Sequence, residues 1–246
     1  MRSEVSIVVP TINEAATLPE LMSRIAKSIG HLRYEVLVID DRSTDGTLEV
    51  CANLSRSYPI TGYARPNPTG GLGGAVLHGF ALASGDVLVV MDADLQHPPE
   101  ALPALVAPLI ARQSDFVIGS RRVAGSTIVD AWGRWRQVNS AFARWLAAPL
   151  TSGIRDPLSG FFALRRATWE QAENLNPLGY KIALELLCKC PVNQVAEIPI
   201  QFGVRRHGSS KLTISQRVGY VRHLIRLYAS YSGTGHRAQR GCHARG

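Results

Sequence analysis

The chain has 246 residues, of which 46% are hydrophobic, and its formal net charge is +8. This length and composition suit one large α/β domain and exclude an intrinsically disordered chain, and no stretch rich in Gly, Ser and Pro divides it in two. Because no run of 18 apolar residues occurs, we expect no membrane-spanning helix. The N-terminal residues also lack a signal-peptide pattern, so we expect the protein in the cytoplasm.

The positive charge is concentrated near the C-terminal end of the sequence. Nine of the 27 Lys and Arg residues lie after residue 197, and none of the 19 Asp and Glu residues does. The remainder of the chain is close to neutral. This distribution indicates a local anionic partner, such as phosphate groups or a lipid surface.

Short apolar strands and helices alternate along the chain. The first strands end in polar residues that open helices, which is the βαβ pattern of a mostly parallel sheet with its site at the strand ends. We expect strands over residues 5–10, 34–39, 87–91, 115–118, 161–164 and 195–201. We expect helices ending near residues 30, 58, 83 and 111, and further helical segments at 132–150, 167–174, 182–190 and 213–232.

The most informative stretch is Asp86–His97. It begins as a continuous apolar run, as in a strand that is buried on both faces, and it ends in Asp92-Ala93-Asp94 with Gln96 close behind. Hard oxygen ligands at the carboxyl edge of a sheet predict a Mg²⁺ or Mn²⁺ site that also binds a diphosphate. Taken alone, the same residues are equally compatible with a solvated turn.

A glycine-rich segment, residues 68–79, leads into the helix that ends near residue 83. Such a loop can let main-chain N–H groups approach a phosphate. The match to a dinucleotide-binding fingerprint is poor, because no strand is expected directly before the segment and no ribose-binding acid follows at the right distance. We therefore favour close packing, or shaping of a nucleotide site, over a Rossmann-type cofactor site.

Cationic residues recur in several later segments. Arg121 and Arg122 follow the fourth predicted strand, and residues 204–212 combine three cations with two hydroxyls around Gly208. Either group suits phosphate binding or a solvated surface. Residues 132–150 and 213–232 both form basic amphipathic patterns, which cover a domain face or lie on an anionic membrane. Residues 233–246 are expected to be a disordered basic tail.

Together these segments resemble the family 2 glycosyltransferases of the GT-A fold. The resemblance rests on Thr11–Glu14, Asp40–Thr47 and Asp92–His97, and within the family the chain looks most like the polyprenol (dolichol) phosphate mannose synthases. That likeness is carried by residues 119–121, Trp132 with Arg136 and Ser140, residues 156–161, 179–181 and 205–212. The chain departs from the family pattern at Ile12, where an aromatic residue is usual, and at Arg42, where glycine is usual.

The resemblance implies a single GT-A domain over residues 1–212, with a Rossmann-like, mostly parallel sheet, followed by a C-terminal amphipathic helix. It implies inverting transfer of mannose from GDP-mannose to a polyprenyl phosphate with Mg²⁺ or Mn²⁺, at the cytoplasmic face of a membrane. Reversible interfacial binding and a small membrane partner subunit are both open, and no nucleic acid is expected. The implied site residues are, for the nucleotide, Pro10, Thr11, Asn13, Glu14, Asp40 and Asp41; for the metal, Asp92, Asp94 and Gln96; for the acceptor phosphate, Arg121, Arg136 and Ser140; and for the anions during transfer, also Arg205 and Lys211.

Two alternatives remain at this stage. The first is transfer of another sugar from a UDP donor to a polyprenyl phosphate or a saccharide hydroxyl, because the sequence does not resolve the donor base. The second is a basic membrane-binding or nucleic-acid-binding module that uses the C-terminal charge. The carboxylates at the strand ends oppose the second alternative, because without a metal they would repel a phosphate backbone.

Overall fold

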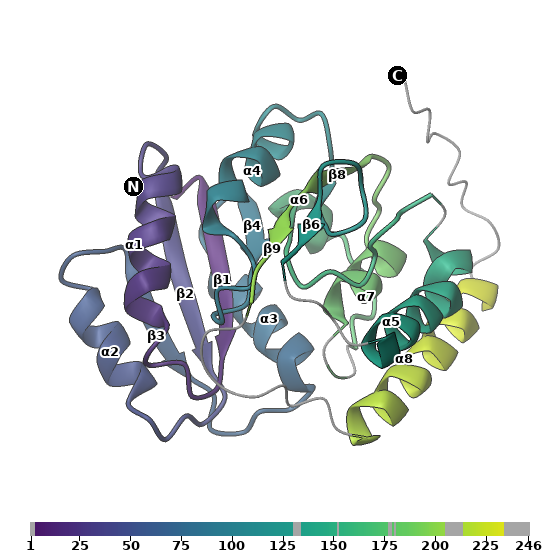
Figure 1. Cartoon of the computed structure of the whole chain (residues 1–246), viewed down its shortest axis with the longest axis horizontal. Helices are drawn as coiled ribbons and strands as arrows, with labels where there is room; N and C mark the ends of the chain where they lie inside the picture. The colour runs from purple at the N-terminus through teal and green to yellow at the C-terminus, as the bar shows by residue number, and fades with distance from the viewer. Residues whose placement is uncertain are drawn as a thin grey trace.

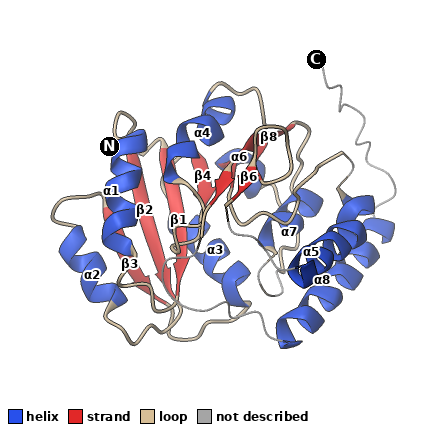
Figure 2. Ribbon diagram, viewed as in Figure 1, coloured by secondary structure: helices blue, strands red, loops and turns tan. Residues whose placement is uncertain are grey.

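The structure is a computed structural model that describes residues 3–129, 134–151, 153–176, 179, 181–204 and 214–233. For residues 134–140, 214–218 and 231–233 it describes the backbone only. Figures 1 and 2 show a central sheet with helices on both faces and two long helices packed together at one end. The predicted α/β architecture is confirmed.

The central sheet has seven strands in the order β3-β2-β1-β4-β7-β5-β8. All neighbouring pairs are parallel except those of β7, which runs antiparallel between β4 and β5. A second, two-stranded sheet pairs β6 with β9. The strands are β1 (Val5–Thr11), β2 (Tyr34–Asp40), β3 (Ile60–Ala64), β4 (Val87–Val90), β5 (Phe116–Ser120), β6 (Thr127–Ile128), β7 (Phe162–Arg165), β8 (Val195–Pro199) and β9 (Gln201–Phe202).

Two hydrophobic cores cover the two faces of this sheet, because successive strand residues point to opposite sides. One core packs the sheet against α1 (Leu18–Ile29), α2 (Thr47–Leu54) and α4 (Leu102–Ile110), with a 3₁₀ turn at Pro99–Ala101 before α4. The other packs it against α3 (Gly71–Leu82), α6 (Arg166–Glu170) and α7 (Ile182–Lys189). The loops that carry the predicted site residues follow the strands at their carboxyl edge.

The helix of the glycine-rich segment packs closely on the sheet. A Cβ on Gly79 would lie 2.4 Å from Val8 Cγ1, so only glycine allows α3 to approach β1 this closely. This contact supports the packing interpretation of the segment. The expectation that no strand directly precedes the segment was wrong: β3 ends at Ala64, and its edge position and Gly62 made it hard to recognise from the sequence.

The two long helices, α5 (Arg134–Ala147) and α8 (Ile214–Gly233), form a third layer. Tyr220 and Tyr228 of α8 each donate a 2.7 Å hydrogen bond from the side-chain hydroxyl to a main-chain carbonyl of α5. A small core of Tyr220, Leu224 and Leu227 joins α8 to α5 and α7. Only part of the predicted apolar face of α8 is buried in this core: Leu224 is buried, whereas its neighbours Val221 and Ile225 are exposed.

None of the helices in the described ranges is long and apolar enough to cross a membrane. The predicted basic tail, residues 233–246, lies outside the described residues except for Gly233 at the end of α8.

A buried polar contact joins α8 to α7. The Nε2 atom of His223 is hydrogen-bonded to Glu185, which also accepts a 2.9 Å bond from the main-chain N–H of Asn176 and pairs with Lys189 at 2.7 Å. Burial alone would raise the pKa of Glu185, but these partners outweigh it and lower the pKa to about 2. The ionised carboxylate therefore stabilises the packing of α7 and α8.

We expect Glu185→Gln to be less stable than wild type at pH 7 and this difference to shrink as the pH falls from about 5 to about 2. The reason is that the carboxyl group has its ordinary pKa of 4.5 when unfolded and about 2 when folded, so its contribution is complete above the first value and is lost toward the second. Urea unfolding at several pH values measures this. Exposed Glu173→Gln is the control, and a pH-independent difference for Glu185→Gln would contradict the assignment.

Candidate active site

The site lies at the carboxyl edge of the central sheet. The loops after β1, β2, β3, β4 and β5 all leave the sheet there, because those strands share one direction. The segment before β7 enters the same edge, because β7 is antiparallel and its first residue, Phe162, lies opposite both Val90 and Ile118. Residues that are far apart in sequence therefore meet at this edge.

The loop after β4 carries the three predicted metal ligands. The Asp92 side chain is 36% exposed, whereas Asp94 and Gln96 are buried. The loop is held by internal bonds: Gln96 N donates to Asp94 Oδ1 at 3.1 Å, and Gln96 Nε2 donates to the carbonyl of Gly203 at 3.2 Å. A Cβ on Gly160 would lie 3.2 Å from Asp92 Oδ2, so the lack of a side chain there leaves room beside this carboxylate.

His97 packs beneath this loop. It is 2% exposed, and its ring stacks on Phe161 with the ring centres 5.4 Å apart. Burial lowers the pKa of His97 to about 4, so the ring is neutral at pH 7. Its Nδ1 atom accepts a long, 3.4 Å hydrogen bond from the main-chain N–H of Asp92. The imidazole thus supports the backbone from which Asp92 projects.

The loops after β1 and β2 bind each other. Asp40 is buried and accepts hydrogen bonds from Ser43 and, at 3.3 Å, from Thr11 Oγ1. Asn13 Oδ1 accepts a 2.8 Å bond from Thr44 N, and Glu14 N donates to Thr47 Oγ1 at 3.1 Å. The structure brings these predicted nucleotide residues together, and much of their hydrogen bonding stabilises the two loops.

Asp41 faces Arg65, a residue that the sequence interpretation missed. Arg65 Nε lies 3.2 Å from Asp41 Oδ1, and both side chains are largely buried. Among the described residues, Asp41 Oδ1 and Arg65 Nη1 are nevertheless buried atoms without a hydrogen-bond partner. Burial and the neighbouring Asp40 raise the pKa of Asp41 against the opposing effect of Arg65. The pair joins the loop after β2 to the loop after β3 and leaves part of its buried hydrogen-bonding capacity unused.

The loop after β5 contributes a fixed arginine. Arg121 donates from Nε and Nη2 to the two oxygens of Asp156 at 2.7 and 2.8 Å, and its main-chain N–H adds a third bond at 3.1 Å. Asp156 is 1% exposed. Burial alone would raise the pKa of Asp156, but the hydrogen bonds and charge of Arg121 hold it below its usual value. The guanidinium also lies 5.3 Å from the ring centre of Phe202.

Lys181 adds a second cation that interacts with both the Arg121–Asp156 pair and Asp92. Its Nζ atom donates to the carbonyl of Leu158 at 2.9 Å, and its charge interacts with Arg121, Asp156 and Asp92. Burial of the ammonium group lowers the pKa of Lys181 to about 8, although the residue as a whole is partly exposed. The sequence contained this residue in the family-like segment 179–181, but no role was assigned to it.

Other predicted acceptor residues fall outside what the structure describes. Arg205 and Lys211 are not described, and of Arg136 and Ser140 only the helical backbone of α5 is described. Two further arginines, Arg122 and Arg144, each keep one buried nitrogen without a hydrogen-bond partner among the described residues. Pro10 lies in β1, beside Ile39 of β2.

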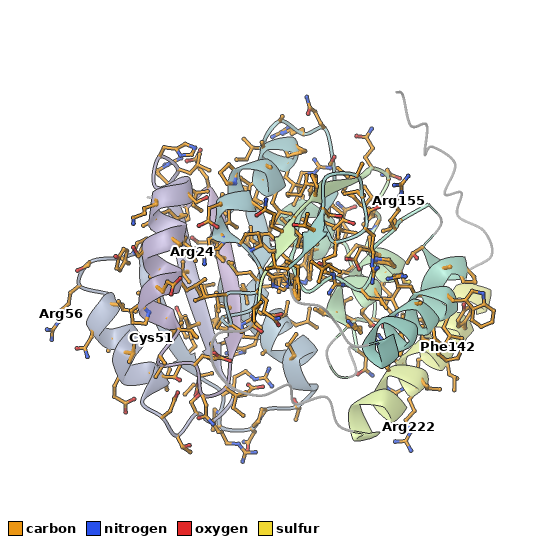
Figure 3. The ribbon with its side chains drawn as sticks, viewed as in Figure 1. Arg24, Cys51, Arg56, Phe142, Arg155 and Arg222 are labelled. Carbon is orange, nitrogen blue, oxygen red and sulfur yellow. The ribbon has the colours of Figure 1, made fainter. Side chains whose placement is uncertain are left out.

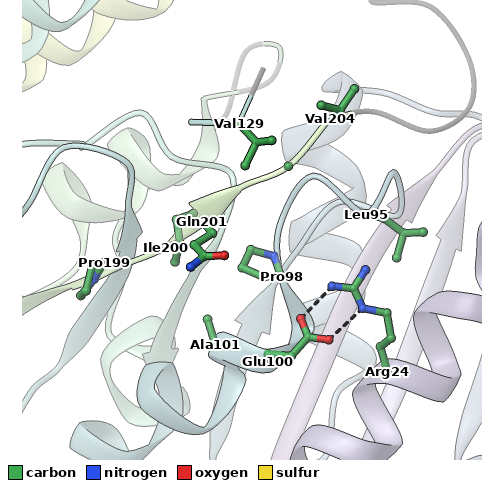
Figure 4. A pocket seen from close by; sticks show the side chains of 11 residues that line it. Arg24, Leu95, Pro98, Glu100, Ala101, Val129, Pro199, Ile200, Gln201 and Val204 are labelled. Atoms are coloured by element: carbon green, nitrogen blue, oxygen red, sulfur yellow. Dashed lines mark hydrogen bonds and ion pairs between the residues drawn. The ribbon is translucent and has the colours of Figure 1, made fainter. Parts of the chain in front are cut away.

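A separate hollow of about 670 Å³ lies next to the loop after β4 (Figure 4). Its walls include Leu95, Pro98 and Val204, and the ion pair between Arg24 and Glu100 closes one side at 2.7 Å. None of the predicted site residues whose side chains the structure describes lines it. Among its described lining residues, the charged side chains are those of this ion pair.

The sequence of the chain is similar to those of known proteins. Residues 6–171 match the model of glycosyl transferase family 2. The chain is 46% identical over 227 residues to dolichol-phosphate mannosyltransferase of Pyrococcus furiosus, covering 91% of this chain and 63% of that protein. It is 38% identical over 239 residues to dolichol-phosphate mannosyltransferase of Saccharomyces cerevisiae, covering 93% of this chain and 88% of that protein.

Solved structures share the fold. Glucosyl-3-phosphoglycerate synthase from Mycobacterium tuberculosis, in complex with uridine diphosphate, superposes with a TM-score of 0.68 at 23% identity, covering 96% of this chain and 82% of that chain. The same synthase in complex with Mn²⁺, UDP-glucose and phosphoglyceric acid gives a TM-score of 0.65 at 23% identity, with 96% and 81% covered. At this identity the likeness concerns the fold. From the match over residues 6–171 and the two mannosyltransferase relatives, this chain belongs to glycosyl transferase family 2.

Proposed function

We propose that this glycosyltransferase moves mannose from GDP-mannose to the phosphate of a polyprenyl phosphate, with inversion at the sugar carbon. The observation that carries the proposal is the meeting of the carboxylate loop Asp92–Gln96 with the fixed Arg121 and with Lys181 at one sheet edge. The names of the relatives in Pyrococcus furiosus and Saccharomyces cerevisiae support the choice of donor and acceptor.

A divalent metal suits the residues of this loop. Asp92, Asp94 and Gln96 offer hard oxygen donors, and within the described ranges no cluster of three His, Cys, Asp or Glu side chains forms a complete metal cage. An incomplete protein shell is typical of Mg²⁺ and Mn²⁺ that take their remaining ligands from diphosphate and water. When bound, the metal would neutralise charge on the departing diphosphate.

The donor nucleotide would lie over the loops after β1, β2 and β3. Pro10, Thr11 and Glu14 would contact the nucleoside, and Asn13 with Asp40 would hold the two loops in register. Asp41 would contact its polar groups, held in place by the ion pair with Arg65. Binding energy and orientation at this end would place the sugar for attack.

The acceptor requires cations more than a base. A phosphate monoester has its second pKa near 6, so it is mostly dianionic at pH 7 and already nucleophilic. We propose that Arg121, Arg136 and Ser140 hold this phosphate, while Arg205 and Lys211 bind the anions during transfer. Lys181 would add positive charge between the acceptor and the diphosphate. Preorganised cations of this kind stabilise the negative charge that accumulates on the leaving group.

The deciding experiment is a transfer assay with radiolabelled GDP-mannose, a polyprenyl phosphate and Mg²⁺. We expect label to move into the lipid fraction, to require the metal and to disappear with EDTA. Parallel reactions contain UDP-glucose in place of GDP-mannose, or a saccharide acceptor in place of the lipid. Lipid labelled from UDP-glucose alone would overturn the mannose assignment, and a labelled saccharide would overturn the acceptor assignment.

We also propose that the helix pair α5 and α8 binds the cytoplasmic face of a membrane. Large apolar side chains are exposed on both helices: Phe142 is 58%, Trp145 69% and Ile225 64% exposed. Figure 3 shows Phe142 and Arg222 on this pair, away from the sheet. Exposed aromatic and aliphatic groups beside arginines favour the boundary between lipid headgroups and chains.

We expect Trp145→Gln and Ile225→Gln each to weaken binding to anionic vesicles at least about tenfold, because each removes an apolar side chain worth roughly 1.5–3 kcal/mol when buried in lipid. Vesicle flotation with a range of lipid concentrations measures the affinity. Ile110→Gln is the matched control, since Ile110 is 46% exposed on α4. Unchanged flotation of both variants would oppose this surface and place the lipid contact elsewhere on the protein, whereas wild-type protein that does not float would favour a membrane partner subunit.

A further inference from the structure

Glu197 binds the main chain beside the fixed arginine of the site. It lies in β8 next to Ile118 of β5. Its two carboxylate oxygens accept hydrogen bonds from two consecutive main-chain N–H groups, from Arg155 at 2.8 Å and from Asp156 at 2.9 Å. The Glu197 side chain therefore anchors the loop at Asp156, whose carboxylate binds Arg121.

The hydrogen bonds continue from Glu197 through Asp156 to the guanidinium group of Arg121. Asp156 binds Arg121 through both carboxylate oxygens, and it also accepts the main-chain N–H of Arg121. A shift of the Asp156 backbone would therefore move the arginine fork. Two-point contacts at each step restrain rotation as well as distance.

We propose that Glu197 is a positioning residue that sets the orientation of Arg121 through Asp156 and so determines affinity for the acceptor phosphate. The inference rests on the proposed function of Arg121. Glu197 lies on β8, whereas Arg121 lies in the loop after β5, and the two side chains make no contact among the contacts described above. The role of Glu197 follows from the pairing of its two carboxylate oxygens with the main-chain N–H groups of Arg155 and Asp156.

Two substitutions separate the chemistry of this contact from its size. In Glu197→Gln the side chain keeps its shape, but its NH₂ group must face one of the two N–H donors, so one hydrogen bond is lost. In Glu197→Asp both oxygens remain on a side chain one methylene shorter. Glu173→Gln supplies the same chemical change at an exposed position.

The first measurement is NMR of the arginine side-chain Nε–H groups in the full chain, with the Arg121 signal assigned by its disappearance in Arg121→Lys. We expect Glu197→Gln to shift this signal and to speed exchange of the Arg155 and Asp156 amides, while Glu173→Gln leaves them unchanged. If Glu197→Gln leaves all three signals unchanged, the proposal is wrong, whatever the enzyme transfers.

The second measurement is steady-state transfer with both substrates varied. We expect Glu197→Gln to raise KM for the polyprenyl phosphate about fivefold to tenfold, with KM for GDP-mannose within about twofold and partial recovery in Glu197→Asp. In an Asp156→Asn background the same substitution should change KM by less than about twofold. If the effects of Glu197→Gln and Asp156→Asn on KM were fully additive, or if Glu197→Gln raised KM equally for both substrates, the positioning role would be wrong. A wild-type enzyme that labels no lipid would instead refute the proposed function, and the NMR result would still decide the role of Glu197.

Discussion

Asp92→Asn is expected to reduce mannosyl transfer at least about a thousandfold while the protein stays folded. The Asp92 side chain is 36% exposed, so its loss removes little packing, but it projects from the loop that we assign to the metal and the diphosphate. Removing one charged ligand weakens both metal binding and stabilisation of the leaving group, which together account for a large part of such catalysis.

The measurement is transfer of radiolabelled mannose at several Mn²⁺ concentrations, together with a thermal unfolding curve. Asp86→Asn is the matched control, because Asp86 is an exposed aspartate at the opposite end of the same strand. We expect the control to keep wild-type activity. Near wild-type transfer by Asp92→Asn at all metal concentrations would remove the metal assignment from this loop.

Arg121→Ala is expected to destabilise the fold by about 3–5 kcal/mol as well as to abolish transfer, since it leaves a buried carboxylate without its partner. Asp156 is 1% exposed and receives three hydrogen bonds from Arg121. The main-chain bond remains in the variant, but both guanidinium bonds are lost. The ionised carboxylate must then be accommodated without its hydrogen-bonded counter-charge, and Lys181 supplies the remaining positive charge nearby.

Urea unfolding at pH 7 measures this effect, and Arg33→Ala is the matched comparison. Arg33 pairs with Glu4 at 3.5 Å, with 60% and 42% of the side chains exposed, so its loss should cost less than about 1 kcal/mol. Arg121→Lys should recover part of the stability but not the two-point geometry. Equal stability losses for Arg121→Ala and Arg33→Ala would show that the Asp156 pair does not anchor the site.

The sequence predicted the strands that are most apolar and the polar residues that follow them. Residues 5–10, 34–39 and 87–91 lie within one or two residues of β1, β2 and β4. A buried parallel strand has a strong hydrophobic pattern because both of its faces lie in the core. β3 is at the sheet edge, and β6 has two residues, so neither has that pattern.

The site was harder to predict where it depends on pairing between distant segments. Arg65 was missed because it follows the unrecognised strand β3, and Lys181 because its ammonium group reaches the site only through the packing of α7. The departure at Arg42 has a local explanation: its φ is +63°, a left-handed conformation that glycine adopts at lower cost. In contrast, the carboxylates of the loop after β4 were evident because they are adjacent in sequence.

The reversed direction of β7 has a consequence for how members of such a fold could diversify. The strands β3, β2, β1 and β4 form a block of parallel neighbours followed by the loops that we assign to the nucleotide and the metal, whereas Arg121, Asp156 and Lys181 all follow β4 in the chain. The antiparallel strand marks the boundary between these blocks. A chimaera that exchanges the segment beyond residue 111 would thus change the acceptor while it inherits the donor site, which makes the end of α4 a natural crossover point for engineering new specificities.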